Sequence, residues 1–307
     1  MEYVLQTQGL TKSYKGINAV NNVNMNIKKG DIYGFIGPNG AGKTTIIRLV
    51  TGLAHPTSGE YKLFGAKHNG KDIYQSRRRV SAIVENPSLY PGLTAYENLM
   101  IQCKILGIVD DAIIDEVLEI VGLSYLRHDN KKVKNFSLGM RQRLSIAISL
   151  LGQPDFILLD EPMNGLDPEG IVDMRELILR LNEENNITFL ISSHILDELS
   201  KIATKYGFIR QGSLIKEITT KELEQECRRS VELTVSDVKK VNVILGDMGI
   251  TDTQIVNSSI IRIYNDVDIS SLIAHLTNNN IIISKVNHKD ESIEDYYLNL
   301  MGGMKHA

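Results

Sequence analysis

The sequence predicts an α/β protein with a parallel sheet, followed by a second, small α/β unit. Three stretches of the chain carry this prediction. The first is a glycine-rich loop at residues 37–45, between an apolar run at 32–36 and an apolar segment at 46–50. The other two are an unbroken apolar run at 156–159 and a mostly apolar run at 188–192, as expected of parallel strands buried on both faces. A strand, a glycine-rich loop and a helix in this order are typical of phosphate binding.

The loop matches the spacing G-x-x-x-x-G-K-[ST]. Its glycines let the backbone curl so that successive N–H groups point at a phosphate, and the helix that follows adds its dipole. We expect Lys43 to reach the β- and γ-phosphates of a nucleotide, and the Thr44 hydroxyl to ligate Mg²⁺. An ordinary glycine-rich turn is the alternative, but the flanking strand and helix favour nucleotide binding. The loop consists of Gly37, Pro38, Asn39, Gly40, Ala41, Gly42, Lys43, Thr44 and Thr45.

Composition limits the possible functions. The chain has 307 residues, 42% of them hydrophobic and 23% charged, with a net charge of −3. This length allows two or more folding units, and the charge gives no electrostatic footprint for nucleic acid. The two cysteines lie far apart, so we expect a reducing compartment and no disulfide framework. No signal pattern appears and no apolar run approaches the ~20 residues of a membrane span. We therefore expect a cytosolic chain that can lie against a membrane.

The segment before the loop alternates like edge strands over residues 1–30. Tyr14 lies in its middle. Half-buried packing is one interpretation of this lone tyrosine. A platform for adenine is the other, because an aromatic face stacks on any base. The spacing leaves both open.

After the loop, residues 60–64 and 80–84 read as strands. Glu85 follows the second of these, at the end that faces ligands in α/β sheets. From 86 to about 152 the composition becomes helical, with a capping box at Thr94 and Glu97 and apolar residues at helical spacing from 99 to 121. A helical lobe is expected there.

Within this lobe, Ser137 and Gly139 open a predicted helix at 140–151. Such a segment offers backbone N–H groups and a hydroxyl to an anion. Taken alone, a capped helix start is the simpler interpretation. The segments that follow give it a second meaning.

The apolar run at 156–159 ends in Asp160 and Glu161. Burying two adjacent carboxylates without compensation is expensive, so a cation or a phosphate-bound water is expected beside them. Asp160 would hold Mg²⁺ through the coordination shell of the ion, and Glu161 would polarise the attacking water. A structural ion pair is the alternative.

Two further polar residues follow. Asp167 lies in a polar turn, where a helix N-cap is the simpler interpretation. His194 comes just after the run at 188–192, at the same edge of the predicted sheet. Its ring N–H could donate to a γ-phosphate, although a lone histidine is more often structural.

From about residue 218 the pattern changes to a β-α-β-β-α-β order, which suggests a ferredoxin-like sheet. From residue 219 onward there are nine Lys plus Arg against thirteen Asp plus Glu, a balance of −4. That balance argues against a nucleic-acid module and leaves dimerisation or regulation. The predicted strands are 231–235, 253–256, 260–264 and 281–286, and the predicted helices are 237–248 and 269–278, with an amphipathic segment at 292–301.

This ordered set of motifs resembles the ATP-binding subunit of an ABC transporter over residues 1–217. The resemblance implies a P-loop NTPase cassette with a RecA-like lobe, a helical lobe and an antiparallel β subdomain, followed by the small α/β domain at 218–307. It also implies a head-to-tail homodimer that sandwiches two ATP molecules. Such a dimer pairs with separate membrane-spanning permease subunits at the cytoplasmic face of the membrane.

The resemblance implies a role for each matching position. Tyr14 would stack on adenine, and Asn39 to Thr45 would hold the phosphates. The Mg²⁺ ligands would be Thr44, Glu85 and Asp160, with Glu161 as the catalytic base and His194 in contact with the γ-phosphate. Ser137 and Gly139 would act on the ATP of the other subunit, and Asp167 would couple the subunits.

Two positions depart from the common pattern of the family. Glu85 stands where glutamine is usual, and Leu138 replaces a glycine in the signature. We therefore expect an active ATPase whose binding of ATP differs from the common pattern of the family. Both departures, together with residues 292–296, closely resemble the bacitracin-resistance exporters and the related lantibiotic-immunity transporters. The bacitracin group matches best, because its likeness extends through the C-terminal unit.

Two other classes remain as alternatives. A soluble ABC ATPase that acts on ribosomes or DNA usually has two cassettes or basic surfaces, whereas this chain has one cassette and an acidic tail. A P-loop kinase or GTPase would leave the Ser-x-Gly segment without a role, and the guanine-reading Asn-Lys-x-Asp tetrad is absent from the sequence.

Overall fold

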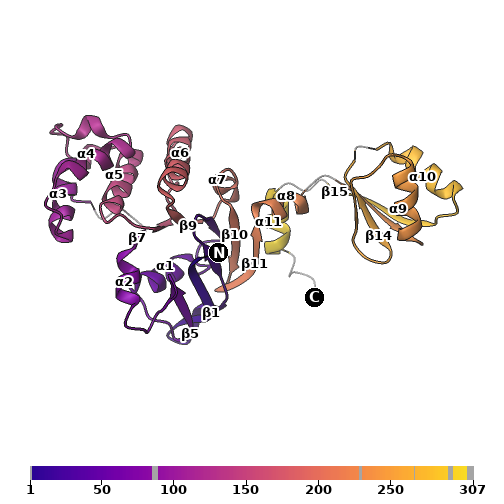
Figure 1. The fold of residues 1–307 in the computed structure, drawn as a ribbon, viewed down its shortest axis with the longest axis horizontal. Helices are drawn as coiled ribbons and strands as arrows, with labels where there is room; N and C mark the ends of the chain where they lie inside the picture. Colours follow the sequence, from indigo (N-terminus) through magenta and orange to yellow (C-terminus); the bar gives the residue numbers. More distant parts are fainter. Residues whose placement is uncertain (1, 85–88, 228–229, 266, 290–292, 303–307) are drawn as a thin grey trace. The chain divides into compact units, whose positions relative to one another are not determined.

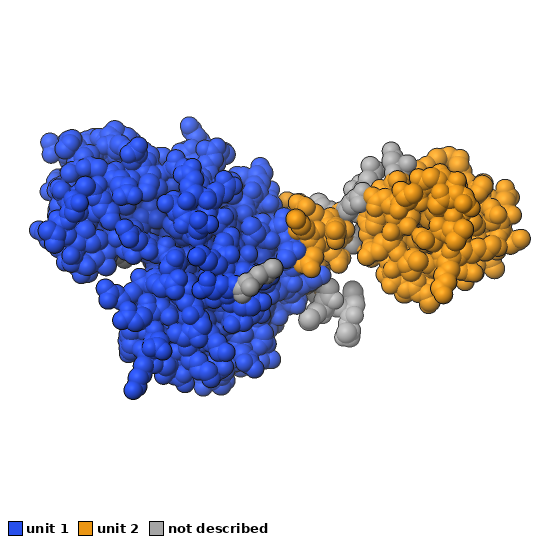
Figure 2. Space-filling model, viewed as in Figure 1, with its two compact units in different colours: residues 1–220 blue, residues 221–307 orange. Residues whose placement is uncertain are grey.

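The computed structural model divides the chain into two compact units, residues 1–220 and 221–307 (Figures 1 and 2). It describes every residue except 1, 85–88, 228–229, 266, 290–292 and 303–307. Each unit has a hydrophobic core of its own. Within the described part of the chain, no helix is both long enough and apolar enough to cross a membrane.

A six-stranded sheet forms the centre of the first unit, with the order β11-β10-β4-β9-β8-β7. The pairs from β10 to β7 are parallel, and β11 joins antiparallel to β10. Every residue of β4, β8 and β9 is buried, which confirms the predicted parallel strands. Their carboxyl ends lie at one edge of the sheet. The strands are β4 (Ile32–Ile36), β7 (Val80–Ile83), β8 (Phe156–Asp160), β9 (Thr188–Ser193), β10 (Lys205–Arg210) and β11 (Ser213–Thr219).

A second, antiparallel sheet of the first unit has the order β2-β1-β5-β6, with β3 paired to β1. Its apolar side chains share one core with β4 and with helix α1, which follows the glycine-rich loop. This arrangement fixes α1 against the parallel sheet. The elements are β1 (Tyr3–Tyr14), β2 (Ile17–Val23), β3 (Asn26–Lys28), β5 (Ser58–Leu63), β6 (Ala66–Lys67), α1 (Lys43–Thr51) and α2 (Ile73–Arg78).

The helical lobe contains α3 (Ala95–Leu106), α4 (Ala112–Ile120) and α5 (Leu138–Leu150). The predicted capping box is confirmed, because the Thr94 hydroxyl accepts from the Glu97 N–H at 3.1 Å and the Glu97 carboxylate accepts from the Thr94 N–H at 2.7 Å. The helical pattern at 99–121 does not form one helix: Gly107 ends α3 in the left-handed conformation, with φ 73°. Short 3₁₀ turns at Ser124–Leu126 and Val133–Asn135 precede α5, and α6 (Pro168–Asn185) and α7 (Leu196–Ser200) follow β8 and β9.

The second unit contains a four-stranded antiparallel sheet with the order β13-β14-β12-β15. Apolar residues of α9 and α10 share a core with β12 and β14. Strand β15 begins two residues later than predicted, because the Ile281 N–H bonds to the Leu276 carbonyl and closes the end of α10. The elements are α8 (Thr220–Cys227), β12 (Ser230–Val235), α9 (Val238–Asp247), β13 (Thr253–Ile255), β14 (Ile260–Ile263), α10 (Ile269–Asn278), β15 (Ile283–Lys289) and α11 (Ile293–Gly302).

Candidate nucleotide-binding site

The glycine-rich loop runs from the end of β4 into α1 and lies tightly against neighbouring backbone. A Cβ atom added at Gly37 would lie 2.3 Å from the Ile209 carbonyl oxygen. Gly42 has φ 110°, and a Cβ there would lie 2.4 Å from the Ala19 carbonyl oxygen. Both positions therefore require glycine, which leaves the loop backbone free to curl toward a phosphate.

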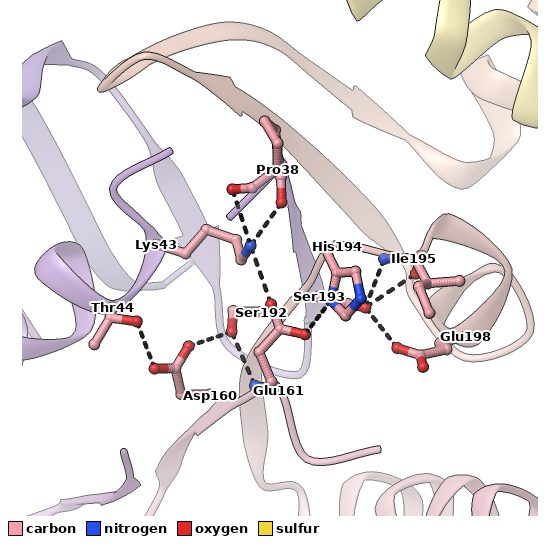
Figure 3. A network of polar contacts seen from close by, with 11 residues as sticks. Pro38, Lys43, Thr44, Asp160, Glu161, Ser192, Ser193, His194, Ile195 and Glu198 are labelled. Carbon is pink, nitrogen blue, oxygen red and sulfur yellow. Dashed lines mark hydrogen bonds and ion pairs between the residues drawn. The ribbon is translucent and has the colours of Figure 1, made fainter. Parts of the chain in front are cut away.

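Lys43 is the first residue of α1, and its side chain is only 6% exposed. Its ammonium group folds back over the loop and donates to the Gly37 carbonyl oxygen at 2.6 Å (Figure 3). The same group lies 3.0 Å from Glu161 Oε1. The loop thus encloses a buried positive charge beside the tip of β8.

Asp160 is the last residue of β8, and hydroxyl groups hold both of its carboxylate oxygens. The Thr44 hydroxyl donates to Oδ2 at 2.6 Å, and the Ser192 hydroxyl donates to Oδ1 at 2.5 Å (Figure 3). Ser192 is not among the site residues predicted from the sequence. The signal that could have found it is its position near the end of β9, the strand beside β8.

These oxygen donors fit Mg²⁺, which proteins usually hold through one or two carboxylates together with water and substrate phosphates. A hydroxyl and a carboxylate 2.6 Å apart at the phosphate loop provide that donor set. In the described part of the chain, no group of three or more His, Cys, Asp or Glu side chains is arranged to hold a metal ion. Glu85, the other predicted metal ligand, lies outside the described residues.

Glu161 and His194 meet at the same edge of the sheet. The Glu161 Oε2 atom lies 2.6 Å from His194 Nδ1, opposite the oxygen that faces Lys43. The backbone of Glu161 has φ 51°, a left-handed conformation that non-glycine residues rarely adopt. Strained residues of this kind cluster at functional sites. The structure therefore brings together the three side chains predicted to act in catalysis, which are Glu161, His194 and Lys43.

A cavity of about 600 Å³ opens in front of this network. Its lining includes most of the phosphate loop together with Asp160 and Glu161. Leu138, the departure in the signature, is also part of the wall, and the remaining lining residues, which have no role predicted from the sequence, are Ala19, Gln142, Asn164 and Gly165.

Seven predicted residues of the described structure lie outside that lining: Gly37 and Pro38 of the loop, His194, and four residues farther along or before the loop, which are Tyr14, Ser137, Gly139 and Asp167. Ser137 caps α5 by accepting from the Met140 N–H at 3.2 Å, next to Gly139 in the first turn. Asp167 caps α6 by accepting from the Gly170 N–H at 2.9 Å, so the simpler interpretation of both caps holds in the structure. Tyr14 ends β1 with 46% of its surface exposed, and the Lys12 ammonium lies 4.9 Å from its ring centre.

Together these features define a class. A glycine-rich loop leads from a buried parallel strand into a helix that begins with lysine and threonine, beside carboxylates at the tip of another strand. This is the phosphate-binding site of a P-loop nucleotide-binding protein.

Comparisons with known proteins identify the family. The ABC transporter family model matches residues 20–164. The bacitracin transport ATP-binding protein BcrA of Bacillus licheniformis is 45% identical, over 99% of both chains, and that of Enterococcus faecalis is 39% identical, over 99% of this chain and 98% of the relative. The lantibiotic transport ATP-binding protein SrtF of Streptococcus pyogenes is 46% identical, over 70% of this chain and 90% of the relative.

Solved structures agree with this assignment. The structure of cbiO1 from Clostridium perfringens, part of the ABC transporter complex cbiONQ, aligns with a TM-score of 0.66 and 26% identity over 81% of this chain and 98% of that chain. A dimeric, post-hydrolysis structure of the ATP-binding cassette MJ0796 with ADP and Pi aligns with a TM-score of 0.62 and 27% identity, over 70% and 98%. The chain therefore belongs to the ATP-binding proteins of ABC transporters, and it is an ATPase that binds and hydrolyses ATP.

Proposed function

We propose that this chain is the ATP-hydrolysing subunit of an exporter that expels the peptide antibiotic bacitracin and confers resistance to it. The observation that carries the proposal is the likeness to two bacitracin transport ATP-binding proteins, which extends over 99% of this chain. A lantibiotic exporter is the second candidate, because the lantibiotic transport protein reaches 46% identity. That likeness covers only 70% of this chain, so the full-length match favours bacitracin.

The geometry supports a division of roles among the site residues. The phosphate loop and Lys43 bind the phosphates, while Thr44 and Asp160 hold Mg²⁺, which neutralises phosphate charge when bound. Glu161 is the general base and takes a proton from the attacking water. His194 orients Glu161 through the 2.6 Å contact at Oε2 and donates to the γ-phosphate. Glu85 is a further Mg²⁺ ligand in this proposal.

Tyr14 is proposed as the platform for adenine. Its ring is 46% exposed, and the Lys12 ammonium lies 4.9 Å from the ring centre. A cation near an aromatic ring is attracted by the ring quadrupole and helps to fix its position. An exposed, fixed ring is suited to stack on a base.

The active form is proposed to be a head-to-tail dimer. Ser137 and Gly139 lie at the start of the 13-residue helix α5, where backbone N–H groups and the helix dipole favour an anion. They would meet the γ-phosphate bound by the second copy, and Asp167 would couple the two subunits. The similar cassette MJ0796 has been solved as a dimer.

The chain is further proposed to work with separate membrane-spanning permease subunits at the cytoplasmic face of the membrane. We assign residues 1–217 to the cassette and residues 218–307 to an accessory domain. A ferredoxin-like fold for that domain is supported by its β-α-β-β-α-β order and by the strand order β13-β14-β12-β15. Dimerisation or regulation is its proposed role.

ATP turnover by purified variants tests the proposed mechanism. Lys43→Ala removes an electrostatic stabiliser and Glu161→Gln removes the base, so each should lower the ATPase rate about 10²-fold or more. The exposed residues Lys29 and Glu183 supply matched controls, because Lys29→Ala and Glu183→Gln make the same changes away from the site. Undiminished turnover in both site variants would refute the assigned roles.

Drug tolerance tests the cargo. Expressing the chain together with the proposed permease subunits should raise the inhibitory concentration of bacitracin, and Glu161→Gln in the same cells should abolish the increase. Protection against a lantibiotic but not bacitracin would favour the second candidate.

A sizing column tests the proposed dimer. ATP should convert the purified Glu161→Gln chain from monomer to dimer, and a persistent monomer would refute the sandwich dimer.

A further inference from the structure

Ser192 connects the two carboxylate residues at the tip of β8. It lies near the end of β9, is 0% exposed, and pairs with Asp160 in the parallel register of the two strands. Its hydroxyl donates to Asp160 Oδ1 at 2.5 Å and accepts from the Glu161 N–H at 3.0 Å. The Ser192 carbonyl oxygen accepts from the same N–H at 3.2 Å. One buried side chain thus contacts both residues.

These contacts fix the orientation of the Asp160 carboxylate. A serine hydroxyl has one proton to donate, and here that proton goes to Oδ1. The Thr44 hydroxyl occupies the other oxygen at 2.6 Å. The carboxylate is therefore held at both oxygens. Because neither donor carries a charge, it keeps its negative charge for a cation.

The same serine supports the backbone of Glu161. An L-residue resists the left-handed conformation that Glu161 adopts at φ 51°. Its N–H is held by the hydroxyl and the carbonyl of Ser192, at 3.0 Å and 3.2 Å. With its backbone held in this way, the Glu161 side chain lies between Lys43 and His194.

We propose that Ser192 is a positioning residue for ATP hydrolysis, which sets the Asp160 carboxylate for Mg²⁺ and the Glu161 carboxylate for water. The inference rests on the proposed roles of those two residues. A buried hydroxyl that only satisfies local hydrogen bonds is the competing explanation, and Thr188 provides such a case on the same strand. Thr188 is 0% exposed, and its hydroxyl oxygen accepts from the Gly30 N–H at 3.0 Å, at the opposite end of β9.

The decisive measurement is Mg²⁺-dependent nucleotide binding by the full chain carrying Glu161→Gln, which prevents turnover. Binding of a fluorescent ATP analogue is followed against Mg²⁺ concentration, with and without Ser192→Ala. Outer-shell partners of metal ligands typically contribute about 10–100-fold to affinity, so the half-saturating Mg²⁺ concentration should rise by that factor. Binding in EDTA should stay unchanged, which also shows that the variant is folded.

Thr188→Val is the matched control, because it removes a buried hydroxyl from the same strand and should leave the Mg²⁺ dependence unchanged. With Glu161 intact, Ser192→Ala should lower kcat about 10–100-fold. Unaltered Mg²⁺ dependence and kcat in Ser192→Ala, or an equal change in Thr188→Val, would overturn the positioning role. If instead Mg²⁺ does not improve ATP binding by the parent chain, the proposed metal role of Asp160 fails, and the inference about Ser192 fails with it.

Discussion

Two glycines of the phosphate loop differ in a way that can be tested by substitution. Gly40 and Gly42 both have left-handed backbones, with φ 77° and φ 110°. A Cβ atom at Gly42 would lie 2.4 Å from the Ala19 carbonyl oxygen, whereas a Cβ at Gly40 would have no heavy atom of the described structure within 4 Å. Gly42→Ala therefore combines backbone strain with a collision, and Gly40→Ala introduces strain alone.

The magnitudes follow from these two terms. A left-handed alanine costs about 1–2 kcal/mol, which is the whole expected effect of Gly40→Ala. Overpacking adds about 1–3 kcal/mol at Gly42, because a backbone carbonyl cannot move aside as a flexible side chain can. The total for Gly42→Ala is then about 2–5 kcal/mol. For a unit of this size, 1 kcal/mol shifts Tm by about 2–4 °C, so Gly42→Ala should lower Tm by roughly 10 °C and Gly40→Ala by about half as much.

Thermal unfolding followed by circular dichroism measures the stability difference, and titration with a fluorescent ATP analogue reports the state of the loop. Gly42→Ala should lose both stability and ATP affinity, because the loop must move away from Ala19 to accept the methyl group. Gly40→Ala should lose less of each. Equal losses of Tm in the two variants would refute the reasoning, since the collision with Ala19 is what distinguishes them.

Two further predictions concern stability. Burial raises the pKa of the Tyr33 phenol well above 10.0, and the Glu217 carboxylate, which accepts its hydrogen bond at 2.9 Å, raises it further. Because the unfolded chain loses this proton at a lower pH than the folded chain, Tyr33 makes the free energy of unfolding fall as pH rises above 10.0. Urea unfolding at a series of pH values should show a smaller fall in Tyr33→Phe. An equal fall in the two proteins would contradict the assignment. Thr94→Ala removes the N-cap of α3 and should lower the free energy of unfolding by about 1 kcal/mol, whereas an unchanged urea midpoint would show that the cap contributes nothing. The hydrogen bond from the Thr94 N–H lowers the pKa of Glu97, and Lys132 lowers it to a smaller extent. The capping box therefore contributes to the free energy of unfolding above the ordinary pKa of Glu97, and this contribution is lost as pH falls through the lowered pKa.

The sequence predicted which residues would meet at the phosphate loop, because buried parallel strands end at one edge of a sheet. Lys43, Asp160, Glu161 and His194 come from three separate stretches, and they lie in one network of contacts. The role of Ser192 could not be predicted. A serine near the end of a strand is ordinary, and this one gains its contacts from the pairing of β8 with β9, a register that the sequence alone does not give.

The helical lobe shows a different reason for a missed feature. Apolar residues keep helical spacing from 99 to 121, but the chain turns at Gly107, where φ is 73°. Spacing reports which residues face a core and is insensitive to a turn that returns the chain to the same core. A glycine within a helical pattern is tolerated often enough that its presence did not decide the break.

The adjacent carboxylates at the tip of β8 show how neighbours give similar side chains different chemistry. Asp160 accepts from two uncharged hydroxyls, so its negative charge is oriented but not neutralised. Glu161 lies 3.0 Å from the ammonium of Lys43 and 2.6 Å from the ring of His194. Its left-handed backbone turns it away from the direction that the strand would impose. A carboxylate with its charge uncompensated suits a cation, and one between a lysine and a histidine suits proton transfer near a phosphate, so the two roles follow from the partners that the fold supplies.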